Sequence, residues 1–299
     1  MSRSTYLEIE RSDGARLGIG APGSAWVLAH EGLDDWLGND YDVSTSPNVL
    51  TDGSTVVSKR VGEVDRTAKA VYSGPDDFEA RQYALSFFNP KHSYRVTVDN
   101  NGVRRWCEGE LTGFECLLRH KSRPAQLTFT ILCSDPYMRG ESRHEASFGD
   151  EVPMFGFPYV DLADVPELPL DYPAGLITSV AVYDGVNTVY NGGDVDAMYR
   201  VRIEARGTVK RPRIDKDGRH IEAALDMAAG DVLVIDFEAS PPRVELNGSN
   251  AINRCTRDSC FTGMALKVGA NKFTASCANA ENRSLMDVQV LYNERMLGV

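Results

Sequence analysis

The chain has 299 residues, 42% of them hydrophobic and 25% charged, which is the composition of a folded globular protein. This length favours two domains over one. The formal net charge of −11 argues against a nucleic-acid binder and against docking on an anionic membrane, since both need a positive surface. No apolar stretch approaches the roughly 20 residues of a membrane-spanning helix. The first residues lack the apolar segment of a signal peptide, so we expect production in a cytosol.

The first sixty residues predict strands and turns, followed by one irregular stretch. Gly18 to Gly23 matches the dinucleotide pattern GxGxxG, but Pro22 removes one amide and no βαβ pattern follows. We therefore interpret it as a glycine-rich strand and turn. A short helical piece from Trp26 to Leu37 is a weaker expectation. The stretch from Asp40 to Arg60 is polar, rich in Ser and Thr and long for a hairpin, and long loops of this kind are often functional.

One helix is predicted after this stretch. Pro75 and the two aspartates that follow it suit a helix N-terminus, where a missing N–H is tolerated and negative charge is favourable. Phe78, Gln82 and Leu85 follow at helical spacing. Asn89-Pro90 should end the helix.

Strands dominate the remainder of the chain. Apolar residues alternate with polar ones in three segments, the pattern of half-buried strands: 127–133, 199–205 and 286–292. Cys133 continues the first alternation, so we expect it on an inward face. Dipeptides that accept the positive φ angles of tight turns recur: Asp13-Gly14, Asp52-Gly53, Asn101-Gly102, Asp184-Gly185, Asn191-Gly192, Asp217-Gly218 and Asn247-Gly248. Such frequent reversals favour an antiparallel, mainly β protein.

The segment from Met138 to Pro173 contains five prolines and no sustained period, which is typical of a linker or extended arm. We therefore expect a first domain over residues 1–140, a linker over 141–173 and a second domain over 174–299. The six cysteines could form three bridges, but without a secretory signal unpaired thiols are the better interpretation. Cys255 and Cys260 are the one pair close enough in sequence to bridge.

Catalytic and metal-binding patterns are not found. His30-Glu31 and His144-Glu145 lack the second histidine of a zinc-protease helix, and no Cys-x-x-Cys or Gly-x-Ser-x-Gly motif occurs. We expect no cofactor, no metal and no catalytic residue. A glycosidase pair could still be formed by carboxylates that meet only in the fold, such as Asp34, Asp35, Asp76, Asp77, Glu108 and Glu110. The basic residues at 210–220 could face an acidic partner, although a solvated hairpin is the simpler interpretation.

The apolar runs and their turns, in this order and spacing, resemble the distal tail proteins of phages and prophages with long non-contractile tails. The residues that carry this resemblance in the first half are Asp52-Gly53, Arg60-Val61, Arg81 to Leu85, Phe87 to Pro90, Arg104-Arg105, Gly109 and Phe129 to Tyr137. In the second half they are Gly230-Asp231, Ile235-Asp236, Asn247-Gly248, Leu266, Gly269 to Asn271 and Val290 to Tyr292, with the ending Gly298-Val299. The segment 138–173 has no counterpart.

The resemblance implies a non-enzymatic structural protein of two β-sandwich or barrel-like domains, the first with one short helix and a long belt-like loop, the second galectin-like. Six copies would form a ring that joins the tail tube protein to tail-tip or receptor-binding proteins at the virion tail tip, after assembly in the bacterial cytoplasm. The belt would be Asp40 to Arg60, with Tyr41, Val43, Val49 and Leu50 as apolar anchors on the neighbouring subunit. Six copies at −11 would give the ring a net charge of about −66. DNA would only pass through the lumen, and an acidic lumen would repel it.

Two other functions remain open at this point. A carbohydrate-binding protein would use aromatic platforms on its second domain, but all three tryptophans precede the linker and only tyrosines with Phe237, Phe261 and Phe273 follow it. A hydrolase with a hidden carboxylate pair is the third interpretation.

Overall fold

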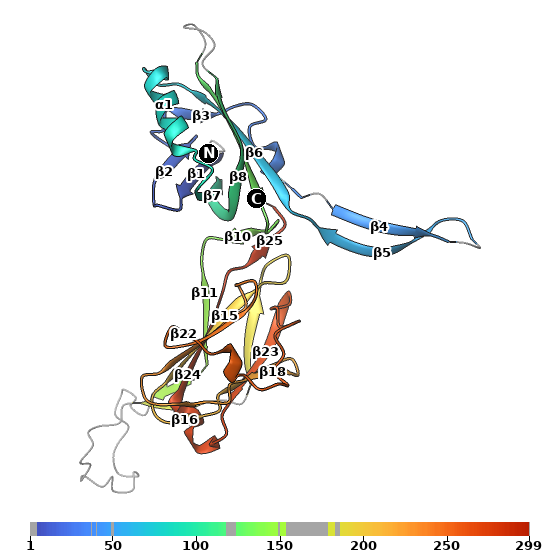
Figure 1. The fold of residues 1–299 in the computed structure, drawn as a ribbon, viewed down its shortest axis with the longest axis vertical. Helices are drawn as coiled ribbons and strands as arrows, with labels where there is room; N and C mark the ends of the chain where they lie inside the picture. Colours follow the sequence, from blue (N-terminus) through green and yellow to red (C-terminus); the bar gives the residue numbers. More distant parts are fainter. Residues whose placement is uncertain are drawn as a thin grey trace, which may run out of the picture. The chain divides into compact units, whose positions relative to one another are not determined.

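The computed structural model describes residues 5–36, 38–39, 41–48, 51–117, 124–148, 150–153, 179–182 and 186–298. The chain divides into two compact units, each with its own apolar core (Figure 1). The first unit consists of residues 1–142, 193–195 and 294–299. The second consists of residues 143–192 and 196–293. The expectation of a mainly β fold with two β domains is confirmed.

The first unit is built on one antiparallel sheet. Its strands are β1 (Thr5–Arg11), β2 (Arg16–Ile19), β3 (Trp26–Leu28), β6 (Val64–Tyr72), β7 (Ser93–Asn100), β8 (Val103–Leu117), β9 (Gln126–Cys133), β10 (Met138–Gly140) and β25 (Arg295–Met296). The order is β2-β1-β7-β8-β9-β6-β3, and β10 pairs with both β8 and β25. The Gly20 N–H donates to the Trp26 carbonyl at 2.7 Å, which links the ends of the two outermost strands. The sheet is therefore a nearly closed barrel.

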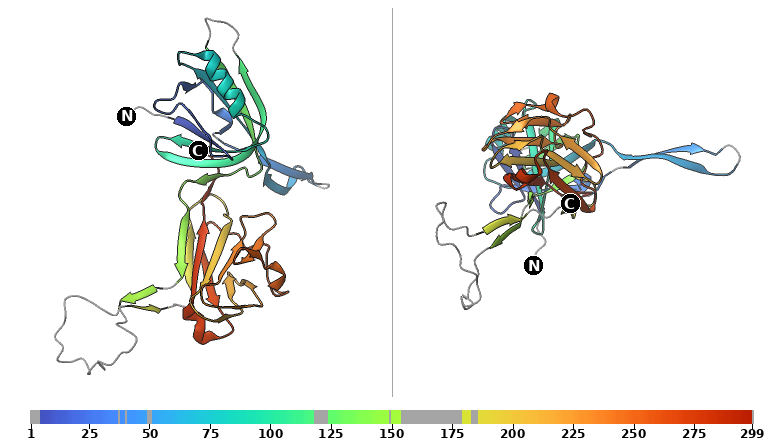
Figure 2. Two further views of the ribbon diagram at one scale, coloured as in Figure 1. Left: turned by 60° about the vertical axis from the view of Figure 1, so that its left-hand side comes forward. Right: turned by 90° about the horizontal axis from the view of Figure 1, so that it is seen from below.

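Helix α1 (Asp77–Phe87) forms where the sequence predicts it (Figure 2). The Asp76 carboxylate accepts from the N–H groups of Phe78 and Glu79, so this residue is the N-cap. The buried side chains of the helix are Ala80, Ala84 and Phe87, one helical stripe. Phe78 and Leu85 lie outside this stripe and are 63% and 42% exposed. The helix predicted from Trp26 to Leu37 was also wrong, because this segment begins with β3 and contains only the 3₁₀ helix η1 (Asp34–Trp36).

Aromatic rings fill the barrel below α1. Phe88 stacks on Phe129 and on Phe114, with ring centroids 4.8 and 5.0 Å apart. The Tyr94 hydroxyl, at a fully buried position, donates to the Phe87 and Asn89 carbonyls and accepts from the Asn89 N–H. The chain that leaves α1 is thereby fixed to the start of β7.

Strands β8 and β9 approach each other most closely at Gly109. A Cβ atom on this residue would lie 2.4 Å from the Ile131 Cγ2 and 2.5 Å from the Leu132 carbonyl oxygen. Both distances are shorter than real Cβ contacts allow, so only glycine fits at this position. The register of the same pair shifts between Leu111 and Gly113, which is a β-bulge.

The second unit is a sandwich of two antiparallel sheets. The larger has the order β11 (His144–Phe148), β24 (Met286–Tyr292), β15 (Tyr199–Ala205), β20 (Val232–Asp236), β21 (Arg243–Leu246) and β22 (Ser249–Asn250). The smaller has the order β14 (Asn187–Asn191), β23 (Gly269–Ser276), β17 (Arg213–Lys216) and β18 (Arg219–Glu222). Short pairs add β12 (Asp150–Pro153) with β13 (Ser179–Val182), β16 (Val209–Lys210) with β19 (Asp226–Met227), and the 3₁₀ helices η3 (Ile252–Arg254) and η4 (Ala280–Leu285).

The inner faces of the two sheets meet at Phe273. Its ring on β23 lies 5.5 Å from that of Tyr199 on β15 and 5.7 Å from that of Phe148 on β11. The alternating residues predicted to point inward on β15 and β24 are all buried. The same is true of the alternation on β9 that ends at Cys133.

Five of the seven predicted turn dipeptides connect paired strands. At Asn101-Gly102, Asp217-Gly218 and Asn247-Gly248 both residues have positive φ, as a type I′ turn requires. Asn191-Gly192 ends β14 without a hairpin, because β14 pairs with β23. Asp184-Gly185 lies outside the described residues. All six cysteines are free thiols, Cys255 and Cys260 included.

The division into units differs from the expected boundaries at two places. β11 lies inside the expected linker but pairs with β24 of the larger sheet. It is an edge strand with mostly exposed side chains, so it carries no apolar period. Residues 294–299 return to the first unit through β25. Residues 154–178 lie outside the described part of the chain. Within that described part, no helix has the length and apolar character needed to cross a membrane.

Candidate functional site

The stretch from Asp40 to Arg60 contains a β-hairpin, called here the arm, formed by β4 (Tyr41–Pro47) and β5 (Ser54–Val61). Among the described residues these strands pair only with each other (Figure 1). Every described residue of the two strands is exposed except Val61, which is half-buried. Asp52-Gly53 lies in the turn, where Gly53 has positive φ and its carbonyl accepts from the Asn48 N–H.

Apolar side chains gather on one face of the arm. Tyr41 and Val43 are two residues apart on β4 and therefore point to the same side. Across the pair, Tyr41 lies opposite Val61. The register shifts between Ser44 and Thr45, which places Val56 opposite Thr45 on that same side. The exposed fractions are 61% for Tyr41, 46% for Val43 and 48% for Val56.

The arm is not stabilised by a core of its own. Its side-chain links are polar: Arg60 Nε lies 2.8 Å from the Asp42 carboxylate, and Thr55 Oγ1 donates to Asn48 Oδ1 at 2.8 Å. Exposed ion pairs of this kind contribute about 0–1 kcal/mol. An isolated two-stranded hairpin is marginally stable in water, and side-by-side exposed apolar residues mark interaction sites. Among the described surfaces, the arm is therefore the one that contact with another protein surface would stabilise most.

The predicted anchor residues fall on this arm in part. Tyr41 and Val43 lie together on its apolar face, whereas Val49 and Leu50 lie outside the described residues. The sequence analysis missed Val56 and the 68% exposed Val57. The adjacent valines just after the Asp52-Gly53 turn were a strand signal that could have identified them.

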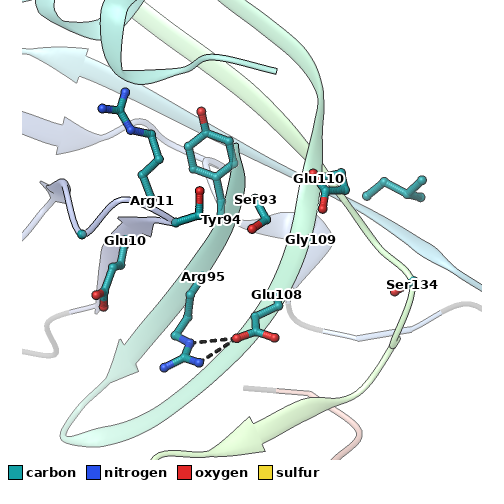
Figure 3. A pocket seen from close by; sticks show the side chains of 12 residues that line it. Glu10, Arg11, Ser93, Tyr94, Arg95, Glu108, Gly109, Glu110 and Ser134 are labelled. Atoms are coloured by element: carbon teal, nitrogen blue, oxygen red, sulfur yellow. Dashed lines mark hydrogen bonds and ion pairs between the residues drawn. The ribbon is translucent and has the colours of Figure 1, made fainter. Parts of the chain in front are cut away.

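An open depression of about 680 Å³ lies over β1, β7 and β8 of the first unit (Figure 3). Its charged groups are already paired with protein groups. Arg95 contacts Glu108 at 2.7 Å and stacks on the Trp106 ring at 4.3 Å. Arg11 pairs with Asp13 at 2.6 Å and donates to the carbonyls of the last turn of α1. The hydrogen bond from Arg11, followed by that from the Ala15 N–H, lowers the pKa of the Asp13 carboxyl.

One serine–histidine contact occurs at this rim. Ser12 Oγ lies 3.0 Å from His92 Nδ1 on an exposed surface. A catalytic pair of this type needs a third group that orients the base, and the nearby Asp13 carboxylate is held by Arg11 on both oxygens. The contact joins two neighbouring turns, which are also linked by the hydrogen bond from Ser12 N–H to the Ser93 carbonyl. It has the arrangement of a structural link.

Two of the candidate carboxylates from the sequence have structural partners. Asp76 caps α1 and Glu108 pairs with Arg95, so neither is free for glycosidase chemistry. No cluster of three or more metal-ligating side chains occurs among the described residues. Four basic residues of 210–220 lie within 3.1 Å of a carboxylate: Arg211 with Glu222, Arg213 with Asp215, Lys216 with Asp217 and His220 with Asp258. Arg219 donates instead to the Thr262 carbonyl.

The second unit has one strongly exposed aromatic side chain among its described residues, Tyr190 on β14, which is 67% exposed. Phe237 and Phe273 belong to its core and are 6% and 0% exposed. Its described depression of about 310 Å³ has no aromatic lining, because the residues around it are Arg211, Arg213, Glu222, Ser276, Cys277 and Ala278. Stacking on an aromatic face, the usual basis of sugar binding, is not available there.

The fold defines a two-unit β protein, with a nearly closed barrel that carries an exposed hairpin arm and a second unit that is a β-sandwich. Residues 192–295 match the sequence model of the family described as siphovirus-type tail component, C-terminal domain. Among solved structures, the Dit protein of phage SPP1, described as a paradigm of the hub adsorption apparatus in phages that infect Gram-positive bacteria, is similar with a TM-score of 0.66. It shares 11% identity over 97% of this chain and 98% of its own.

Two structures of the phage P2 baseplate in its activated conformation are also similar. The form with Ca has a TM-score of 0.54 and 10% identity over all of both chains, and the form with Sr has 0.52 and 9% over 99% of each. A comparison with curated proteins gave no significant match. Residues 192–295 thus carry the sequence pattern of the siphovirus-type tail component family, and the whole chain has the fold of the SPP1 Dit protein. The resemblance noted in the sequence is confirmed.

Proposed function

We propose that this protein is a structural distal tail protein whose copies assemble into a six-membered ring, which joins the tail tube to the tail-tip or baseplate proteins. The observation that carries the proposal is the arm, an exposed hairpin with a row of apolar side chains on one face. The likeness in fold to hub and baseplate proteins supports it. Its place is the virion tail tip, after assembly in the host cytoplasm.

In such a ring the arm of one copy lies on the first unit of the next. Tyr41, Val43 and Val56 leave water on contact, which favours association by about 25 cal/mol for each Å² of apolar surface covered. The two surfaces in the contact are different, so it is heterologous and closes into a ring only if the rotation between copies is right. The same arm without a closing rotation would give open filaments.

The assembled ring, rather than a single copy, is the proposed binding surface for the other tail proteins. The tail tube protein and the tail-tip or receptor-binding proteins are its proposed neighbours, and DNA only passes through the central hole. No catalytic role is proposed, because the charged groups at the candidate sites are paired with protein groups. Recognition of a surface glycan by the second unit is less well supported, since Phe237 and Phe273 are in the core.

Light-scattering mass with electron microscopy tests the proposal. The unchanged chain should give rings of six 32.9 kDa copies, about 197 kDa, with a central hole. Val43→Asp places a charge on the apolar face of the arm and should leave a monomer. Ser44→Asp adds the same charge at the neighbouring residue, whose side chain points to the opposite face of the arm. This variant should still form rings.

Val43→Asp should remain folded, because the arm contributes no side chain to the barrel core, and it should lack only the stabilisation that ring contacts give to the other two proteins. The proposed ring would be contradicted if the unchanged chain had a mass of 32.9 kDa both alone and with tail tubes added. Rings formed equally well by Val43→Asp would exclude the arm as the contact.

A further inference from the structure

Two buried thiols meet inside the first unit. Cys107 on β8 and Cys133 at the end of β9 have their sulfur atoms 3.6 Å apart. The two residues are 2% and 0% exposed. Neither side chain takes part in the arm or in the depressions described above. Such a contact between thiols 26 residues apart in sequence is not required by packing alone, since any small apolar pair would fill the space.

A buried arginine lies beside this pair. Arg66 on β6 is 0% exposed. Its guanidinium donates to three neutral oxygens: the carbonyls of Asp35 and Pro136 and the amide oxygen of Asn39. Its Nε atom is buried without a hydrogen-bond partner. Among the described residues, no carboxylate lies within ion-pair distance of it.

An unpaired charge in a protein interior is costly, so a group that can supply the opposite charge nearby is favoured in its ionised form. The Cys133 thiol is such a group. The hydrogen bond shared with Cys107 lowers its pKa, and the charge of Arg66 acts in the same direction. The pKa of Cys107 is raised by the same shared hydrogen bond and by burial. Asp135, the other charge near both sulfurs, is paired with Arg139 and Arg295.

We propose that Cys107 and Cys133 are a redox pair in which Cys133, beside Arg66, reacts as its thiolate with a peroxide and then closes to a disulfide with Cys107. Because both sulfurs are buried, only a small oxidant can reach them, and hydrogen peroxide is nearly as small as water. The inference does not depend on the proposed ring, and either can fail without the other.

The chemistry balances in two steps. The Cys133 thiolate attacks one peroxide oxygen, the O–O bond breaks, and Cys133 becomes a sulfenic acid while hydroxide leaves. Cys107 then loses its proton and attacks the Cys133 sulfur, the S–O bond breaks, and the departing oxygen leaves as water. Two thiols and one hydrogen peroxide give one disulfide and two waters. The sulfurs must move from 3.6 Å to about 2.05 Å, a shift within reach of side-chain rotation.

The bond would tie β8 directly to β9 within the barrel. A protein assembled as a dithiol in a reducing cytoplasm would then gain a covalent link after release into an oxidising medium. Because the link closes the stretch from residue 107 to residue 133, it restricts the unfolded chain and raises the melting temperature of the first unit by about 5 °C or more.

The test treats the folded protein with a small excess of hydrogen peroxide and follows each thiol by peptide mass. Cys116 is the matched control: it also lies on β8, is 7% exposed, and burial raises the pKa of its thiol. We expect a Cys107–Cys133 linked peptide, two hydrogens lighter, at least tenfold sooner than any change at Cys116. In Cys107→Ser the second step is blocked, so a sulfenic acid should accumulate at Cys133 and be captured by dimedone.

Cys133→Ser tests the order of the steps. In this variant Cys107 should stay unreactive at the same peroxide concentration and treatment time. The proposal would be overturned if Cys107, Cys133 and Cys116 were oxidised at one common rate. A common rate would mean that peroxide reaches all three thiols only when the whole unit unfolds. Absence of dimedone capture in Cys107→Ser, in a variant that melts like the unchanged protein, would overturn it too.

Discussion

The close approach of β8 and β9 at Gly109 allows a sharp prediction for Gly109→Ala. The new methyl group would lie about 1 Å too close both to Ile131 Cγ2 and to a main-chain oxygen of Leu132. Ile131 is 0% exposed, so its side chain has no free space to move into. Overpacking of this kind costs about 1–3 kcal/mol, and a clash with backbone belongs at the upper end. About 3 kcal/mol corresponds to a fall in melting temperature of about 6–12 °C for a unit of this size.

Tryptophan fluorescence measures this change in the first unit alone, because Trp26, Trp36 and Trp106 all lie in it and the chain has three tryptophans. Gly113→Ala is the matched control on the same strand. There the added methyl group meets only Thr130, at an ordinary contact distance of 3.4 Å. We expect its melting temperature to stay within about 3 °C of the unchanged protein. Equal melting temperatures for the two variants would refute the argument that β9 leaves no room beside Gly109.

Three further predictions concern the same unit. Asp76→Ala removes the cap of α1 and should cost about 1 kcal/mol of unfolding free energy in a urea titration, whereas Asp76→Ser should restore most of it. Tyr94→Phe removes the buried hydroxyl that donates to the Phe87 carbonyl and should cost about 1–3 kcal/mol, with the fluorescence spectrum of the folded protein unchanged. Asp13 has a lowered pKa in the folded state, so its stabilising effect is complete above the unfolded pKa of about 3.9 and is lost as the pH falls below it. Asp13→Asn should therefore show a shallower loss of stability between pH 4 and pH 2, and an unchanged slope there would contradict the pairing with Arg11.

Much of the fold could be predicted from local chemistry. The alternation at 199–205 and at 286–292 predicts β15 and β24, because a half-buried strand must place every second side chain inside. The turn dipeptides predict hairpins, because only glycine, asparagine and aspartate readily accept the positive φ of tight turns. These signals act over two to seven residues and need no knowledge of the rest of the chain.

The features that could not be predicted depend on distant residues. The buried face of α1 uses Ala80 and Ala84, because small side chains let the helix lie close to the barrel, whereas the larger Phe78 and Leu85 are exposed. β11 is a strand only because β24 offers it hydrogen bonds. The arm looked like an irregular loop, since a hairpin exposed on both sides has no need for a polar–apolar alternation. The contact between Cys107 and Cys133 joins strands that no local pattern brings together.

The pairing of β10 with β25 makes the second unit an insertion within the first. Met138 lies opposite Met296 and Arg139 opposite Arg295, so the chain leaves the barrel and returns to it at adjacent positions of one sheet. A segment whose two ends are neighbours can be exchanged for a longer, shorter or unrelated one without changing the register of the strands that hold it. Recombination could therefore replace the second unit as a cassette, provided that residues 193–195, which belong to the first unit, are kept, and the barrel and its arm would stay intact.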